Sequence, residues 1–163
     1  MSLGIVLYER LKELGAGNNT VSVAAGSNHA LLNIVDSDRY SVTLHDLIVG
    51  GTLRPTSGLQ TLLDVAASAL IHELQYLEEP LARIEFDATA GQGILRSAQP
   101  YREGETLSYW EVRLDTGAAP TARIARYSWS PGLIEREPVA YPATFRLLAR
   151  ITDSMATALA SAL

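Results

Sequence analysis

Apolar residues recur at helical spacing at both ends of the chain. Over residues 3–14, leucine returns every three or four positions opposite charged side chains, and Gly15 follows as a stop, which predicts a first helix. A similar stripe predicts a last helix that begins at Pro142 or Ala143 and runs to the C-terminus, because proline suits a first helical turn. Each helix has one wide apolar face that the rest of the fold must cover.

The clearest pattern predicts a helix over residues 57–79, with Thr56 or Ser57 as its N-cap and Pro80 after its end. At about 100° per residue, its leucines fall on one face and its polar residues on the other. This helix is therefore amphipathic and should lie across a sheet. The polar stripe consists of Thr61, Asp64, Ser68, His72, Gln75 and Glu79.

Alternating apolar and polar positions predict strands between these helices. Two strands are predicted before the second helix. The candidate stretches are residues 20–25, residues 29–35, whose pattern is more ambiguous, and residues 40–49. An antiparallel meander of four strands follows the second helix, at residues 83–89, 94–98, 106–115 and 121–128.

The predicted order is α-β-β-α-β-β-β-β-α within one domain, residues 1–163. Short hairpins between the strands favour an α+β fold, a single twisted antiparallel sheet with helices packed on one side. Secretion chaperones use a similar order, as do several other small α+β families. This similarity concerns the fold alone and rests on no shared motif.

The composition excludes several kinds of site and binding partner and indicates the cellular compartment. The chain has no cysteine, which excludes thiolate metal sites and disulfides. Its net charge is −5, Lys12 is its only lysine and its arginines are scattered, so it lacks the positive stripe that nucleic acid or an anionic membrane requires. It shows no signal peptide or membrane-spanning stretch, and we expect a cytoplasmic protein.

The chemical signals are weak. Three histidines, His29, His45 and His72, lie on different elements without the short spacing of a metal site. Asp64, Ser68 and His72 are the residue types of a catalytic triad and share one face of the predicted helix. A row of solvent-exposed side chains explains them better than a triad does. We therefore predict no metal, no cofactor and no catalytic residue, and favour a protein that is not an enzyme.

Glu73 breaks the pattern of the second helix, because it falls inside the apolar arc beside Ala66, Leu70 and Leu77. A carboxylate there needs a cation or a hydrogen-bond donor, or its pKa rises. We expect Glu73 to be largely buried and paired with an arginine such as Arg83 or Arg96. It is also the best single candidate for an acid, a base or a ligand-binding group.

Tyrosine and arginine gather on the predicted strands of the second half. Tyr109 shares a strand face with Glu111 and Arg113, and Tyr127 shares one with Arg123. If the two strands pair, the outer face of the sheet combines residue types that are enriched at protein interfaces. We therefore predict a binding surface at Tyr109, Arg113, Arg123 and Tyr127.

The principal functional hypothesis is a non-catalytic module that binds another protein, including a second copy of itself as a homodimer. The alternative is a small-ligand-binding protein or an enzyme with a pocket between the sheet and helix 57–79, near Glu73. A third possibility is a structural component of a larger assembly.

Overall fold

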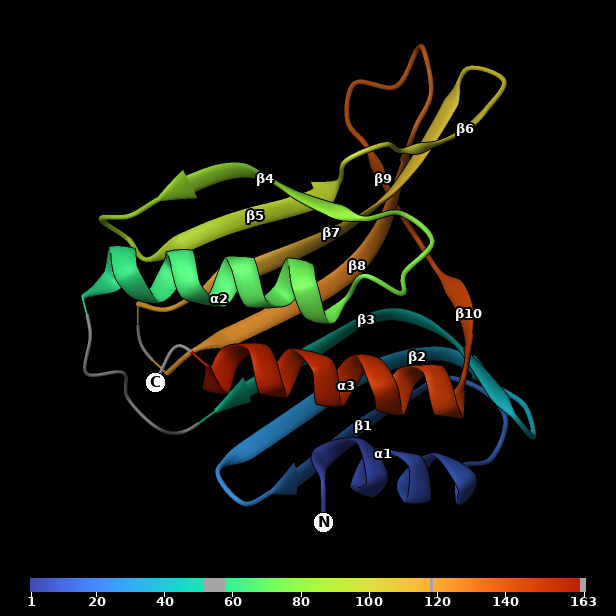
Figure 1. The fold of residues 1–163 in the computed structure, drawn as a ribbon. Helices are drawn as coiled ribbons and strands as arrows, with labels where there is room; N and C mark the ends of the chain where they lie inside the picture. Colours follow the sequence, from blue (N-terminus) through green and yellow to red (C-terminus); the bar gives the residue numbers. More distant parts are fainter. Residues whose placement is uncertain (52–57, 118, 162–163) are drawn as a thin grey trace.

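The computed structural model describes residues 1–51, 58–117 and 119–161. Figure 1 shows the helices lying in front of one large sheet. All strand pairs in that sheet are antiparallel, so the predicted mixed α+β class and antiparallel sheet are confirmed. The helices are α1 (Leu3–Lys12), α2 (Leu59–Glu73) and α3 (Phe145–Ala160). The strands are β1 (Asn19–Ala25), β2 (Asn28–Ser37), β3 (Ser41–Gly51), β4 (Leu81–Asp87), β5 (Gln92–Ser97), β6 (Tyr101–Glu103), β7 (Thr106–Asp115), β8 (Thr121–Trp129), β9 (Glu137–Val139) and β10 (Tyr141–Thr144).

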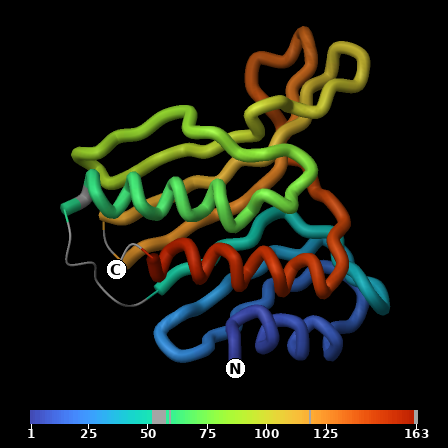
Figure 2. The backbone as a smooth tube through the Cα atoms, in the orientation of Figure 1, coloured from blue at the N-terminus to red at the C-terminus, as the bar shows by residue number. Residues whose placement is uncertain are grey.

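The sheet has the strand order β1-β2-β3-β8-β7-β5-β4, and the two central strands β3 and β8 separate from each other part-way along their length. They pair with each other from Asp46 opposite Ala125 to Gly50 opposite Thr121. Further along, β8 pairs with β9 and β3 pairs with β10, so the segment that holds β9 and β10 fills the fork between them. The path of this segment from one arm of the sheet to the other can be followed in Figure 2.

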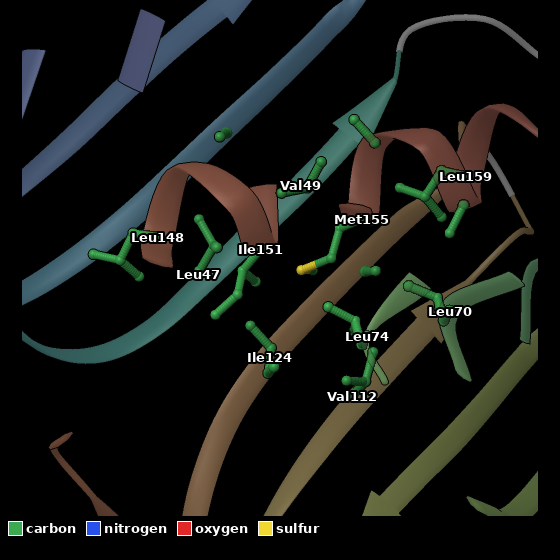
Figure 3. Close-up of a cluster of buried hydrophobic side chains, with 14 of the residues drawn as sticks. Leu47, Val49, Leu70, Leu74, Val112, Ile124, Leu148, Ile151, Met155 and Leu159 are labelled. Carbon is green, nitrogen blue, oxygen red and sulfur yellow. The ribbon is translucent and has the colours of Figure 1, made fainter. Parts of the chain in front are cut away.

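The core lies between the sheet and the helices. Figure 3 shows α3 directing its apolar side chains towards β3, β8 and the end of α2. The side chains in this cluster are buried, which is the main source of stability for a domain of this size. They include Leu47, Val49, Leu70, Leu74, Ile124, Leu148, Ile151, Met155 and Leu159.

Three strands precede α2, not two. Residues 29–35, which the pattern left ambiguous, belong to β2, and this strand pairs with β1 on one side and β3 on the other. Burial alternates along β2, as expected for a strand that is covered on one face. Its outward positions also carry apolar residues, Leu31 and Val35, and these obscure the alternation in the sequence.

The second helix ends at Glu73, six residues before the predicted end at Glu79. Its predicted cap at Thr56 or Ser57 lies outside the described residues. Leu77 nevertheless remains buried, because the chain continues against the core in successive turns. Glu79 is also buried, although the helical projection placed it on the polar stripe.

The last helix begins at Phe145 and not at Pro142. The reason is β10, in which Pro142 lies opposite Thr43 of β3. The side chain of Thr144 then caps the helix by accepting a hydrogen bond from the backbone N–H of Leu147 at 3.1 Å.

Candidate functional site

The four residues of the predicted binding surface lie side by side on β7 and β8. Tyr109 is directly opposite Tyr127, and Arg113 is directly opposite Arg123. The two tyrosine rings are 6.2 Å apart between centroids. Trp110, between Tyr109 and Glu111, is buried towards the core, so the four side chains belong to the face that carries no helix. We call this face the outer face.

Glu111 is the centre of a cluster on the outer face. It accepts hydrogen bonds from Arg96 Nε at 2.9 Å, Arg113 Nε at 3.2 Å and Arg136 Nη2 at 2.9 Å. Its side chain is only 1% exposed. The strand pattern placed Glu111 on the same face as Tyr109 and Arg113 but did not indicate its burial, and the three arginines explain how a carboxylate can be buried there.

Electrostatics keep this carboxylate ionised. Burial by itself would raise the pKa of Glu111, but the hydrogen bonds and charges of Arg136 and Arg96 outweigh burial and lower the pKa below its ordinary value. The same contact with Glu111 raises the pKa of the Arg136 guanidinium. The cluster therefore stays fully charged at neutral pH.

Arg136 also changes what the outer face offers to a partner. It comes from the segment between β8 and β9, and its guanidinium carbon lies 3.8 Å from the centroid of the Tyr127 ring. Tyr127 is consequently only 9% exposed, so it is not the open aromatic surface that the strand pattern indicated. No periodicity marks Arg136, and sequence reasoning missed it.

A second set of contacts continues the network across the sheet. Arg123 donates from Nε to Asp46 Oδ2 at 2.8 Å and from Nη1 to the Tyr127 hydroxyl at 3.1 Å. Asp46 also accepts from Asn33 Nδ2 at 2.6 Å. Polar side chains from β2, β3 and β8 are thus held in fixed positions, which is what a preformed binding surface requires.

The open part of the outer face is a row that crosses four strands. Glu85 of β4 lies opposite Ile94 of β5, which lies opposite Arg113 of β7, and Arg123 of β8 follows. A pocket of about 450 Å³ opens along this row, lined also by Asp87 and Asp115. Across the sheet, an acidic, an apolar and a basic side chain therefore follow one another on neighbouring strands. Arg113 is the most exposed arginine of the row, with 55% of its side chain accessible.

Glu73 does not have the environment that its place in the helical arc predicts. It is half-buried, and it forms no ion pair with any residue in the described part of the chain. The two proposed partners are engaged elsewhere, Arg83 with Asp64 and Arg96 with Glu111. The expected buried pair is formed by Glu79 with Arg126, because the chain turns inward after α2.

The other weak signals behave as solvated or local groups. No cluster of metal-binding side chains occurs among the residues that the structure describes. Asp64 and Ser68 are exposed, and His72 hydrogen-bonds Gln75 one turn away. Within residues 1–51, 58–117 and 119–161, every helix is too short or too polar to cross a membrane.

Comparison with known proteins leaves the geometry as the basis for any functional argument. No family model, no curated protein and no solved structure matches the chain.

Proposed function

We propose that this chain is a protein-binding module that forms a homodimer through the outer face of its sheet. The observation that carries the proposal is the row Glu85, Ile94, Arg113 across β4, β5 and β7. A contact between two identical surfaces requires a patch that is complementary to itself. This row has that property, since an apolar residue separates an acid from a base.

The geometry of such a dimer follows from the spacing of strands. Neighbouring strands are about 4.8 Å apart, so Glu85 and Arg113 flank Ile94 at nearly equal distances. A two-fold axis through Ile94, parallel to the strands, brings Ile94 against its copy. The same axis places Glu85 of each copy over Arg113 of the other, which gives two charge pairs around an apolar centre.

Other features favour the face over an edge of the sheet. The register of β4 with β5 shifts between Arg83 and Glu85, which interrupts the row of backbone groups that edge pairing would need. The apolar side chain of Ile84 is 46% exposed at this shift. The irregular β4 edge therefore favours association through the outer face over pairing at β4.

The test uses opposite charge reversals. In Arg113→Glu, carboxylates from the two copies meet, and in Glu85→Arg, guanidinium groups meet, so each variant alone should be monomeric by sedimentation equilibrium. An equimolar mixture of the two should restore a dimer, since each charge then meets its opposite. Wild-type protein should be dimeric at the same concentration.

The matched control is Arg10→Glu, which makes the same change in charge on the exposed surface of α1 and should leave the dimer intact. Circular dichroism checks that each variant is folded. Arg113 contacts the buried Glu111, whereas Glu85 makes no ion pair in the described chain, so Glu85→Arg is the decisive variant if Arg113→Glu unfolds. A wild-type monomer at high concentration, or a Glu85→Arg dimer, would rule out the proposal.

A further inference from the structure

A second pocket lies on the opposite, helix-bearing side, at the fork of the sheet. It has a volume of about 310 Å³, at the lower end of the range for small-molecule sites. Its walls come from four places in the chain: the turns after α2, strands β7 and β8, strand β10 and the first turn of α3. Residues that line it include Tyr76, Trp110, Arg126, Tyr141 and Leu147.

Two hydrogen-bond donors at this pocket have no partner. Trp110 Nε1 and the Tyr141 hydroxyl are buried and lack a hydrogen bond to any described residue. Their rings pack edge to face, with centroids 4.4 Å apart. Burial raises the pKa of the Tyr141 hydroxyl, which therefore keeps its proton as a donor. Buried polar groups in native proteins are almost always paired, so two orphans in one place call for a partner.

The neighbouring acceptor is already occupied. Glu79 receives hydrogen bonds from Arg126 at 3.1 and 3.0 Å and from Ser97 Oγ at 2.8 Å. The hydroxyl of Tyr76 is hydrogen-bonded to Ser154 at 2.9 Å. The buried groups that remain unpaired at the pocket, among the described residues, are the donors of Trp110 and Tyr141, which match a ligand that supplies an acceptor.

We propose that this pocket binds a small, uncharged, mainly apolar molecule that carries a carbonyl or amide oxygen. The aromatic and aliphatic walls suit the apolar body. The two donors are closed to solvent in this structure, and they suit the oxygen once the packed Trp110 and Tyr141 rings shift to admit it. The charge of Arg126 is neutralised by Glu79, and Glu78 adds a negative charge to the lining, so an anionic ligand is disfavoured. This inference is independent of the dimer proposed above, because it concerns the other side of the sheet.

The test uses Trp110 as its own reporter. The chain has two tryptophans, and Trp129 is 36% exposed, so Trp129→Phe leaves a single tryptophan at the pocket. Three probes of similar size separate the possible causes of binding: benzamide has a neutral acceptor, toluene has none, and benzoate is charged. Benzamide should change the Trp110 emission saturably, and its affinity should exceed that of the other two by about tenfold, the effect of one good hydrogen bond.

Tyr141→Phe removes the hydroxyl and keeps the ring. It should weaken benzamide binding by about tenfold while raising the thermal midpoint of the unliganded protein, because an unpaired buried donor is lost. Leu147→Phe should abolish binding by filling the pocket. Ligand-observed NMR on the unmodified chain provides the same ranking if Trp129→Phe disturbs the fold.

Two results would overturn the inference. Equal affinities for benzamide and toluene would show that the donors play no part in binding. A lower thermal midpoint for unliganded Tyr141→Phe would show that the hydroxyl already has a partner, such as a fixed water molecule.

Discussion

Arg126 donates hydrogen bonds from both terminal nitrogens to the two carboxylate oxygens of Glu79, 47 residues away in sequence. Glu79 is buried and Arg126 is mostly buried, at the point where the chain leaves α2 and enters β4. The Glu79 carboxylate also accepts from Ser97, whose hydroxyl in turn accepts from the backbone N–H of Trp110 at 2.8 Å. The pair thus joins the turns after α2 to three strands of the sheet.

Removal of one partner of this pair should be strongly destabilising. Arg126→Met leaves the Glu79 carboxylate buried with only the Ser97 hydroxyl as a donor, and we expect a loss of ~3–5 kcal/mol in the free energy of unfolding. Urea denaturation followed by circular dichroism measures it. The double variant Glu79→Gln/Arg126→Met should recover part of the loss, since no buried charge remains. A double variant less stable than Arg126→Met would contradict this account.

Gly4 marks a close contact between α1 and α3. Its backbone N–H donates to Asp153 Oδ1 at 2.7 Å, and a Cβ atom built on Gly4 would lie 2.4 Å from the Ala149 carbonyl oxygen. Gly4→Ala should therefore force the helices apart at a cost of ~1–3 kcal/mol. Gly15→Ala is the matched control, because a Cβ there meets nothing within 4 Å. Equal unfolding free energies for the two variants would show that the helices separate freely.

The lowered pKa of Glu111 predicts a specific pH dependence. The ionised carboxylate stabilises the fold fully at pH values above its unfolded-state pKa of ~4.3. This contribution is lost as the pH falls through that value towards the lower pKa of the folded state. The difference in unfolding free energy between wild type and Glu111→Gln should thus be largest near neutral pH and should shrink on acidification. A difference that is constant with pH would refute the assignment.

Arg136 should stabilise the protein through both Glu111 and the Tyr127 ring. Arg136→Ala removes two contacts at once and should cost ~1–3 kcal/mol in unfolding free energy, with increased quenching of tyrosine by acrylamide as Tyr127 becomes accessible. Arg102→Ala is the control, because Arg102 is exposed on β6 and forms no ion pair within the described residues; its effect should lie within about 0.5 kcal/mol.

The sequence pattern correctly predicted which side chains share a face of a strand, because this depends only on residues that are close together in the chain. The alternation along β7 correctly placed Tyr109, Glu111 and Arg113 on one face, away from the buried Trp110, because successive side chains of a strand point in opposite directions. The pairing of the strands that carry Tyr109 and Tyr127 also followed from the predicted meander, whereas their register comes from the structure. These residues need no information from distant parts of the chain.

Distant contacts account for what the sequence did not reveal. The helical period continued through Glu79, but α2 ends at Glu73, and the Glu79 carboxylate pairs with the distant Arg126. Strands β9 and β10 are short and contain prolines, and only their neighbours β8 and β3 define them. The burial of Glu111 likewise depends on Arg136, which lies in an irregular segment with no periodic signal.

The fork in the sheet has a consequence for the order of events in folding. Strands β1 to β3 pair with neighbours in sequence, as do β4, β5, β7 and β8, so each half of the sheet can form through short loop closures. The halves join only where β3 meets β8, through residues as far apart as Asp46 and Ala125, which makes that step the entropically costly one. The segment with β9 and β10 has no complete binding place until this junction exists. It should therefore dock after the rate-limiting step, so that substitutions in it accelerate unfolding and leave the folding rate nearly unchanged.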